Sequence, residues 1–229
     1  MTLNSAGAIA DDASAATVVT GGVLTADAAG AIEIDSTVAS ADISTSAAGA
    51  VDLDETDGIT LTDLDTTDGS ITVDAGGLIT ATDVVASGST GDSVTLSTTT
   101  GGAVATLVTG ADAVSITADA GDVTVGALTA TAGILGVTAT TGSINDAADD
   151  NTADFTAGGL ITLTAQDEIG VLGSGSDTDL EFAAGSSVNV STTGTGAIDL
   201  DGLGALTLSD VDTANGAITV TSALSLIHI

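Results

Sequence analysis

The chain has 229 residues, of which 43% are hydrophobic and only 1% are aromatic. It contains 32 acidic residues but neither Lys nor Arg, so its formal net charge is −32 at pH 7. Nucleic acids, heparin-like polysaccharides and anionic membranes all need basic residues, and this charge argues against each of them as a direct partner. With no Cys, the chain has neither a disulfide framework nor a thiolate metal site.

The kind of apolar residue narrows the fold further. Since aromatic anchors are almost absent, the core must consist of Val, Ile, Leu and Ala in thin, regular layers, which suits a narrow solenoid better than a wide sandwich. The chain has 30 Gly and no Pro, so its turns must be made by Gly, Asp, Asn, Ser and Thr.

A short unit of Gly followed by alternating apolar residues recurs along the chain. It reads Gly-Ala-Ile-Glu-Ile at 30–34, Gly-Ala-Val-Asp-Leu at 49–53 and Gly-Ser-Ile-Thr-Val at 69–73. The first apolar residues of these units, Ile32, Val51 and Ile71, are 19 and 20 positions apart. Comparable units follow at 94–96, 114–116, 121–125, 142–144, 159–163, 196–200, 204–208 and 216–220.

Each unit predicts a short strand with one buried and one wetted face. In the unit at 69–73, Ile71 and Val73 point to one side and Thr72 to the other, because successive side chains of a strand alternate. Shorter apolar pairs between the units give two or three strands in every 20 residues, which is one coil of a single-stranded parallel β-helix, a β-solenoid. About eleven coils at roughly 4.8 Å each predict a rod on the order of 50 Å long.

Two other folds fit less well. Gly breaks the pattern every eight to twelve residues or so, and no apolar 3.6-residue period runs long enough for a helix. An immunoglobulin-like sandwich uses strands at similar spacing, but stacked copies explain the self-similarity better. We therefore expect one solenoid over residues 1–223, interrupted by a polar excursion at 145–155.

The last six residues, 224–229, match neither the composition nor the period of the rest. Their sequence, Leu-Ser-Leu-Ile-His-Ile, back-translates to CTG TCT CTT ATA CAC ATC, which resembles a transposon-end adapter used in preparing sequencing libraries. On this hypothesis the native sequence stops near Ala223, the chain is a fragment, and its single His, His228, is an artefact. Reading the encoding DNA settles the point.

The repeats resemble those of filamentous-haemagglutinin-like exoproteins, a group of large bacterial adhesins. The likeness covers most of residues 7–223 and is strongest at 142–146 (Gly-Ser-Ile-Asn-Asp), 155–165 (Phe-Thr-Ala-Gly-Gly-Leu-Ile-Thr-Leu-Thr-Ala) and 168–170 (Glu-Ile-Gly). The resemblance implies a right-handed parallel β-helix that forms the exported shaft of a surface protein. It also implies an extracellular or cell-surface location, flanking repeats of the same chain as partners, and contact with a host or neighbouring cell through other regions.

Three acidic turns are the best candidates for a binding site. Carboxylates at alternate positions share one face of a strand and supply the hard oxygen ligands that Ca²⁺ prefers. The EF-hand pattern is not met, and the alternative is that these are solvated turns in which Asp bonds to its own backbone. The candidate calcium ligands are Asp52, Asp54 and Asp57, then Asp63, Asp65 and Asp68, then Asp210, Asp212 and Asn215.

Pairs of Thr at alternate positions suggest a second kind of binding module. Several are separated by close to one coil, so their hydroxyls would form ladders as in solenoid ice-binding proteins, although outward Thr is also ordinary in strands. The pairs are Thr60/Thr62, Thr80/Thr82, Thr98/Thr100, Thr138/Thr140 and Thr162/Thr164.

Catalysis is disfavoured by the residues that are missing. Polysaccharide lyases and hydrolases use carboxylates, but they also need Lys, Arg or His to hold acidic sugars and stabilise developing charge. A nucleophilic Ser needs a partner base, and His228 lies in the anomalous tail. Phe155 and Phe182 are predicted to be core residues. We therefore expect a structural shaft without catalysis or cofactor, and a Ca²⁺-binding or ice-binding module as the alternative.

Overall fold

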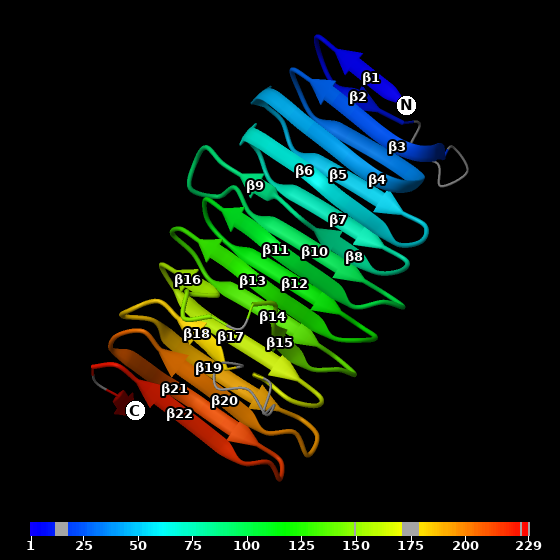
Figure 1. Ribbon diagram of the computed structural model, residues 1–229. Coiled ribbons are helices and arrows are strands. Elements are labelled where there is room, and N and C mark those ends of the chain that lie inside the picture. The colour runs from blue at the N-terminus through cyan, green and yellow to red at the C-terminus, as the bar shows by residue number, and fades with distance from the viewer. Residues whose placement is uncertain (12–17, 149, 171–178, 225, 229) are drawn as a thin grey trace.

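Figure 1 shows the computed structural model as a pile of short strands running from one end of the molecule to the other. The structure describes residues 1–11, 18–148, 150–170, 179–224 and 226–228. Within these residues there is no helix, so none is long and apolar enough to cross a membrane. Every strand pair is parallel, and about ten coils follow one another roughly 20 residues apart, which confirms the β-solenoid.

The strands form two stacks, and each coil contributes to both. The first stack contains β2 (Ile9–Ala10), the first part of β4 (Ile32–Ala48), β5 (Val51–Glu55), β7 (Ile71–Ala75), β10 (Val94–Thr98), β12 (Val114–Ala118), β14 (Leu135–Ala139), β17 (Leu160–Ala165), β19 (Ser187–Thr192), β21 (Leu206–Thr213) and β23 (Leu226–His228). The second stack contains β1 (Thr2–Ser5), β3 (Val19–Ala28), the second part of β4, β6 (Ile59–Asp68), β8 (Ile79–Ala81), β9 (Val84–Ala86), β11 (Ala103–Gly110), β13 (Val123–Ala130), β15 (Ile144–Asp146), β16 (Phe155–Ala157), β18 (Leu180–Phe182), β20 (Ile198–Gly202) and β22 (Ile218–Ser222).

The register gives the length of each coil. Ile32 pairs with Val51 and Val51 with Ile71, so these coils have 19 and 20 residues, as the repeat predicted. The longest coils follow later, where Leu135 pairs with Ile161 and Ile161 with Val188, separations of 26 and 27 residues. The paired strands of the first stack nevertheless stay in register across both coils.

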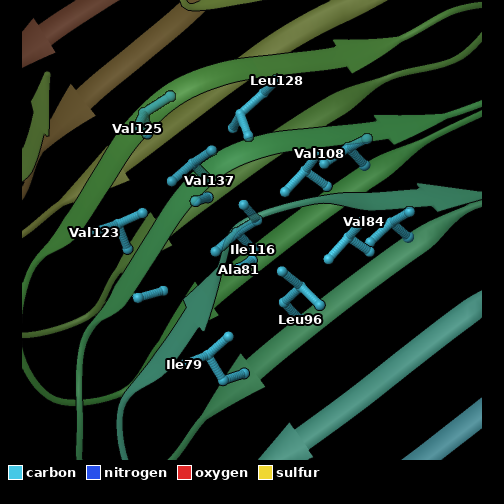
Figure 2. Packing of buried hydrophobic residues seen from close by; sticks show 14 of the residues in the cluster. Ile79, Ala81, Val84, Leu96, Val108, Ile116, Val123, Val125, Leu128 and Val137 are labelled. Carbon is cyan, nitrogen blue, oxygen red and sulfur yellow. The ribbon is translucent and has the colours of Figure 1, made fainter. Parts of the chain in front are cut away.

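Alternation decides which residues enter the core. In β7, Ile71 and Val73 are completely buried whereas Asp74 is exposed, as the sequence predicted. Equivalent residues of successive coils stack into apolar columns, because parallel strands in register place like positions above one another. Figure 2 shows two such columns meeting in one core: Leu96, Ile116 and Val137 from the first stack, and Val84, Val108 and Leu128 from the second.

Glycine and threonine shape the corners between the two stacks. The Thr66 and Thr98 hydroxyls each donate to a glycine carbonyl three residues later, which satisfies an acceptor that the turn leaves outside the ladders. A Cβ atom added to Gly69 would lie 2.3 Å from the Gly49 carbonyl oxygen of the preceding coil. The close approach of two backbones therefore explains why the repeating unit begins with Gly.

Replacing Gly69 by Ala should destabilise the protein, whereas the same change at Gly136 should not. The new methyl at position 69 meets backbone that cannot swing aside, which typically costs about 1–3 kcal/mol. Gly136 lies in β14 with nothing within 4 Å of an added Cβ, so Ala there should be neutral or stabilise by up to about 1 kcal/mol. Urea denaturation of both variants measures the difference, and equal midpoints would contradict the corner explanation.

Candidate functional site

The second stack is interrupted between β15 and β16. The chain leaves the stack after Asp146, which pairs with Val125, and returns at Phe155, which pairs with Leu128. The polar excursion expected from the sequence lies between these two points, bounded by Asp146 and Asp154. Asp146 occupies the position that continues the apolar column of Val125, so a carboxyl group enters a line of aliphatic side chains at this coil.

The two phenylalanines of the chain meet beside this interruption. Phe155 of β16 pairs with Phe182 of β18, and both side chains are completely buried, which confirms that they are core residues. Their ring centroids are 5.1 Å apart and the ring planes are inclined by 18°, a stacked pair. In the preceding coils the same column consists of Val84, Val108 and Leu128. The two aromatic rings continue this column.

Glu181 is buried where alternation would have exposed it. It lies between Leu180 and Phe182, which both point into the core, so its own side chain is directed to the outside of the stack. Its exposed fraction is nevertheless 1%, and that of Asp154 is 4%. The outer side of β18 is therefore covered at this coil, unlike the outer side of most strands in the solenoid.

Asp146, Asp154 and Glu181 form what we call the carboxyl cluster. One carboxyl oxygen from each lies within 4.8 Å of the others. The Glu181 N–H donates to Asp154 Oδ2 at 2.8 Å, and the Asp154 N–H donates to the Glu181 carbonyl oxygen at 3.0 Å. The Asp154 carboxyl thus lies beside the carboxyl groups of both Glu181 and Asp146. The cluster thus joins both ends of the excursion to the next coil.

The surroundings of the cluster favour the protonated acid. Burial raises the pKa of Asp154 to about 9. The neighbouring carboxyl groups of Glu181 and Asp146 also raise this pKa, whereas the hydrogen bond from the Glu181 N–H lowers it. Burial also raises the pKa of Asp146, an effect that backbone hydrogen bonds partly offset. No Lys or Arg exists in the chain to balance these charges. Burial therefore favours the protonated form of Asp154.

Proton sharing is what this arrangement does chemically. A hydrogen bond between two carboxyl groups requires that one of them carries a proton and donates it. Ca²⁺ takes six to eight oxygen ligands, and here three residues point at one another with two of them sealed from solvent. The three carboxyl groups have no Lys or Arg neighbour and are close enough to hold a proton between them.

Sequence reasoning did not find this cluster. Glu181 is 27 residues from Asp154, and no spacing rule links a carboxyl in one coil with the ends of an excursion in the coil before. The only signal was the density of acids in 145–155, which indicated a break in the repeat and not a burial site.

The candidate calcium ligands are distributed over three separate places. Asp52 and Asp54 lie on β5 in the first stack, whereas Asp63 and Asp65 lie on β6 in the second stack. The third group begins on β21, several coils away. All nine residues are exposed; they are Asp52, Asp54, Asp57, Asp63, Asp65, Asp68, Asp210, Asp212 and Asn215. The first and third groups therefore occupy equivalent positions of the first stack in distant coils, whereas the second group lies at a different corner.

Within these groups the carboxylates form ladders along the axis. Asp35, Asp54 and Asp74 are in register on three successive coils. Burial and then the charges of Asp52 and Asp74 raise the pKa of Asp54. The pKa of Asp65 is raised in the same way by burial and by Asp63 and Asp83. Like charges stacked at strand spacing repel, so the ladders are sites of strain that protons relieve.

The Thr pairs do not line up as a continuous array. Thr60 and Thr80 are in register on the second stack, but Thr62 lies at a register shift and Thr82 follows β8. Thr98 is buried at a corner. Thr138 pairs with Thr164 while Gly136 pairs with Thr162, so only one member of that pair is stacked on another Thr.

The tail that the sequence set apart is also placed in the solenoid. Leu226–His228 form β23, which pairs with β21, while Ser225 and Ile229 lie outside the described residues. This pairing does not test the origin of the encoding DNA. Comparisons of the chain with protein-family models, with curated proteins and with solved structures found no match.

Proposed function

We propose that this chain is a structural shaft or spacer of a large secreted or surface-exposed bacterial adhesin, and that it catalyses no reaction. The observation that supports this is a register maintained from one end of the described chain to the other. One column of the first stack runs through Ile9, Ile32, Val51, Ile71, Val94, Val114, Leu135, Ile161, Val188 and Leu208.

A continuous column makes a stiff element whose length depends on the number of coils. Each inner coil is hydrogen-bonded to the coil before and the coil after it, and its apolar residues contact both neighbours. A coil adds about 4.8 Å of length, the spacing between neighbouring strands. Such an element holds two ends apart at a fixed distance, which is the task of a spacer.

The surface is consistent with an exposed, solitary rod. Outward positions and corners carry the acidic residues, and a net charge of −32 opposes side-by-side association of neighbouring rods. The adhesin and its extracellular location come from the resemblance of the repeats. On this proposal the partners are flanking repeats of the same chain, and any contact with a host or neighbouring cell is made by other regions.

A distance measurement tests the spacer directly. The chain has no Cys, so Thr2→Cys and Thr219→Cys, both exposed and both in the second stack, give two unique positions for spin labels. Duplicating residues 94–113, one full coil, should lengthen a narrow distance distribution by about 4.8 Å. A Gly/Ser segment of the same length inserted before residue 94 serves as the control and should broaden the distribution. A duplicated coil that gives a broad or unchanged distribution would contradict the proposal.

A further inference from the structure

We propose that the carboxyl cluster of Asp146, Asp154 and Glu181 is a pH-sensitive latch, which holds two successive coils together by shared protons and releases them when those protons are lost to alkaline solvent.

The latch joins two successive coils at a point where strand pairing alone connects them weakly. β15 and β16 are strands of only three residues, and β16 pairs with β18 through a single residue pair, Phe155 with Phe182. Next to that pair, the Asp154 side chain accepts the Glu181 N–H and contacts the Glu181 carboxyl. In an earlier coil β9, the equivalent strand, also has three residues but pairs with β6 and β11 through all three. The carboxyl cluster therefore adds a contact where strand pairing in the second stack is reduced to one residue pair.

Every charged group that faces the cluster is acidic. The strand on one side, β13, carries no titratable residue, and on the other side Glu181 pairs directly with Asp201 of β20. The chain offers no Lys or Arg to any of them. Protons are therefore the only neutralising partner that solvent always supplies. The titratable residues around the latch are Asp146, Asp150, Asp154, Asp179, Glu181, Asp199 and Asp201.

Loss of the shared proton makes the interaction between the two carboxyl groups repulsive. With Asp154 protonated, the two carboxyl groups can lie together without repulsion; with both ionised, two buried carboxylates face each other with no counter-charge. The proton leaves to water, and the separation of the two carboxylates exposes them to solvent. Burial places the pKa of Asp154 at about 9, so the transition falls at mildly alkaline pH and the latch is closed at neutral pH.

The two phenylalanines are placed to report on this event. They are the only Phe residues, and each is adjacent in sequence to a latch residue: Phe155 to Asp154, and Phe182 to Glu181. Labelling the whole chain with fluorophenylalanine gives two ¹⁹F resonances from one stacked pair. We expect both resonances to shift together as the pH is raised from about 6 to about 10, with a midpoint near 9.

Variants separate the latch from general charge effects. Asp154→Asn keeps the shape of the side chain and cannot ionise, so it should abolish the alkaline transition. Asp52→Asn removes one exposed carboxylate from the first stack and should leave the transition unchanged. If Asp154→Asn does not fold, Glu181→Gln provides the same test from β18.

Three outcomes would overturn the latch. The first is a ¹⁹F spectrum that does not change over this pH range in the unsubstituted chain. The second is a transition that persists in Asp154→Asn. The third is a spectrum that is insensitive to pH but changes on adding millimolar Ca²⁺, which would show that a cation and not a proton holds the cluster. None of these results bears on the spacer, which is tested by the spin-label distances.

Discussion

The free energy of unfolding should be highest at acidic pH and should fall as the pH rises from about 4 to about 9. Asp154 has an ordinary pKa of 3.8 when unfolded and a pKa of about 9 in the fold, so between these values the folded chain binds more protons than the unfolded chain. Stability then decreases with pH by about 1.4 kcal/mol per unit for each extra proton that the folded state holds. The contribution is complete below pH 3.8 and is lost as the pH passes through about 9.

Other carboxyl groups add to the same trend. Burial is the largest cause of a raised pKa at Asp54, Asp65, Asp146 and Asp199. Asp150 differs, because hydrogen bonds from Thr152 lower its pKa, but its carboxylate is on the surface. The net effect is the reverse of ordinary acid denaturation, in which carboxylates paired with cations lose their partners as they are protonated.

Urea denaturation at a series of pH values between about 4 and 10 measures this dependence. Asp154→Asn should flatten the curve and should be more stable than the unsubstituted chain at pH 9, because the variant has no buried charge to form. Asp52→Asn again serves as the control: it removes one exposed carboxylate and, acting only through the pKa of Asp54, should change the slope far less than Asp154→Asn does. A stability that rises with pH over this range would contradict the assignment of buried, protonated acids.

Replacing Phe182 by Ala should lower the free energy of unfolding by about 3–5 kcal/mol. The ring is completely buried, stacks on Phe155 at 5.1 Å, and faces Gly202 in the following coil, which has no side chain to fill the space. The loss should therefore lie near the upper end of the range for such substitutions.

Calorimetric or urea unfolding of matched variants checks this expectation. Phe182→Leu keeps most of the apolar volume and should cost less than half as much as Phe182→Ala. Leu224→Ala removes a side chain that is 81% exposed and should leave stability unchanged within about 0.5 kcal/mol. A cost below about 1 kcal/mol for Phe182→Ala would mean that the two aromatic residues are not part of a close-packed column.

Much of the solenoid was predictable because its rules are local. Alternation in a five-residue strand decides that Ile71 and Val73 are inside and Asp74 is outside, and nothing distant is needed to settle it. The spacing of about 20 residues and the leading Gly follow from stacking each coil on a copy of itself, as the contact between Gly69 and Gly49 shows. In a repeating sequence, the residues that contact one another in the tertiary structure are therefore equivalent positions of neighbouring repeats.

The acidic residues show the limit of such reasoning. The turns after Asp52 and Asp63 look alike in sequence, yet they belong to different stacks, because each coil turns two corners and the local pattern does not say which corner is meant. The third acidic segment, at 210–216, begins on β21, several coils away. A ligand set inferred from repeated motifs needs the positions of the coils before its members can be brought together.

The sequence by itself determined the parallel coils, the apolar columns and the absence of any cationic side chain. Only the tertiary structure decided that Glu181 is buried and that it meets Asp154 and Asp146. The physical reason is that an outward-facing residue is buried only if residues from elsewhere in the chain lie over it. The alternation within β18 carries no information about those residues.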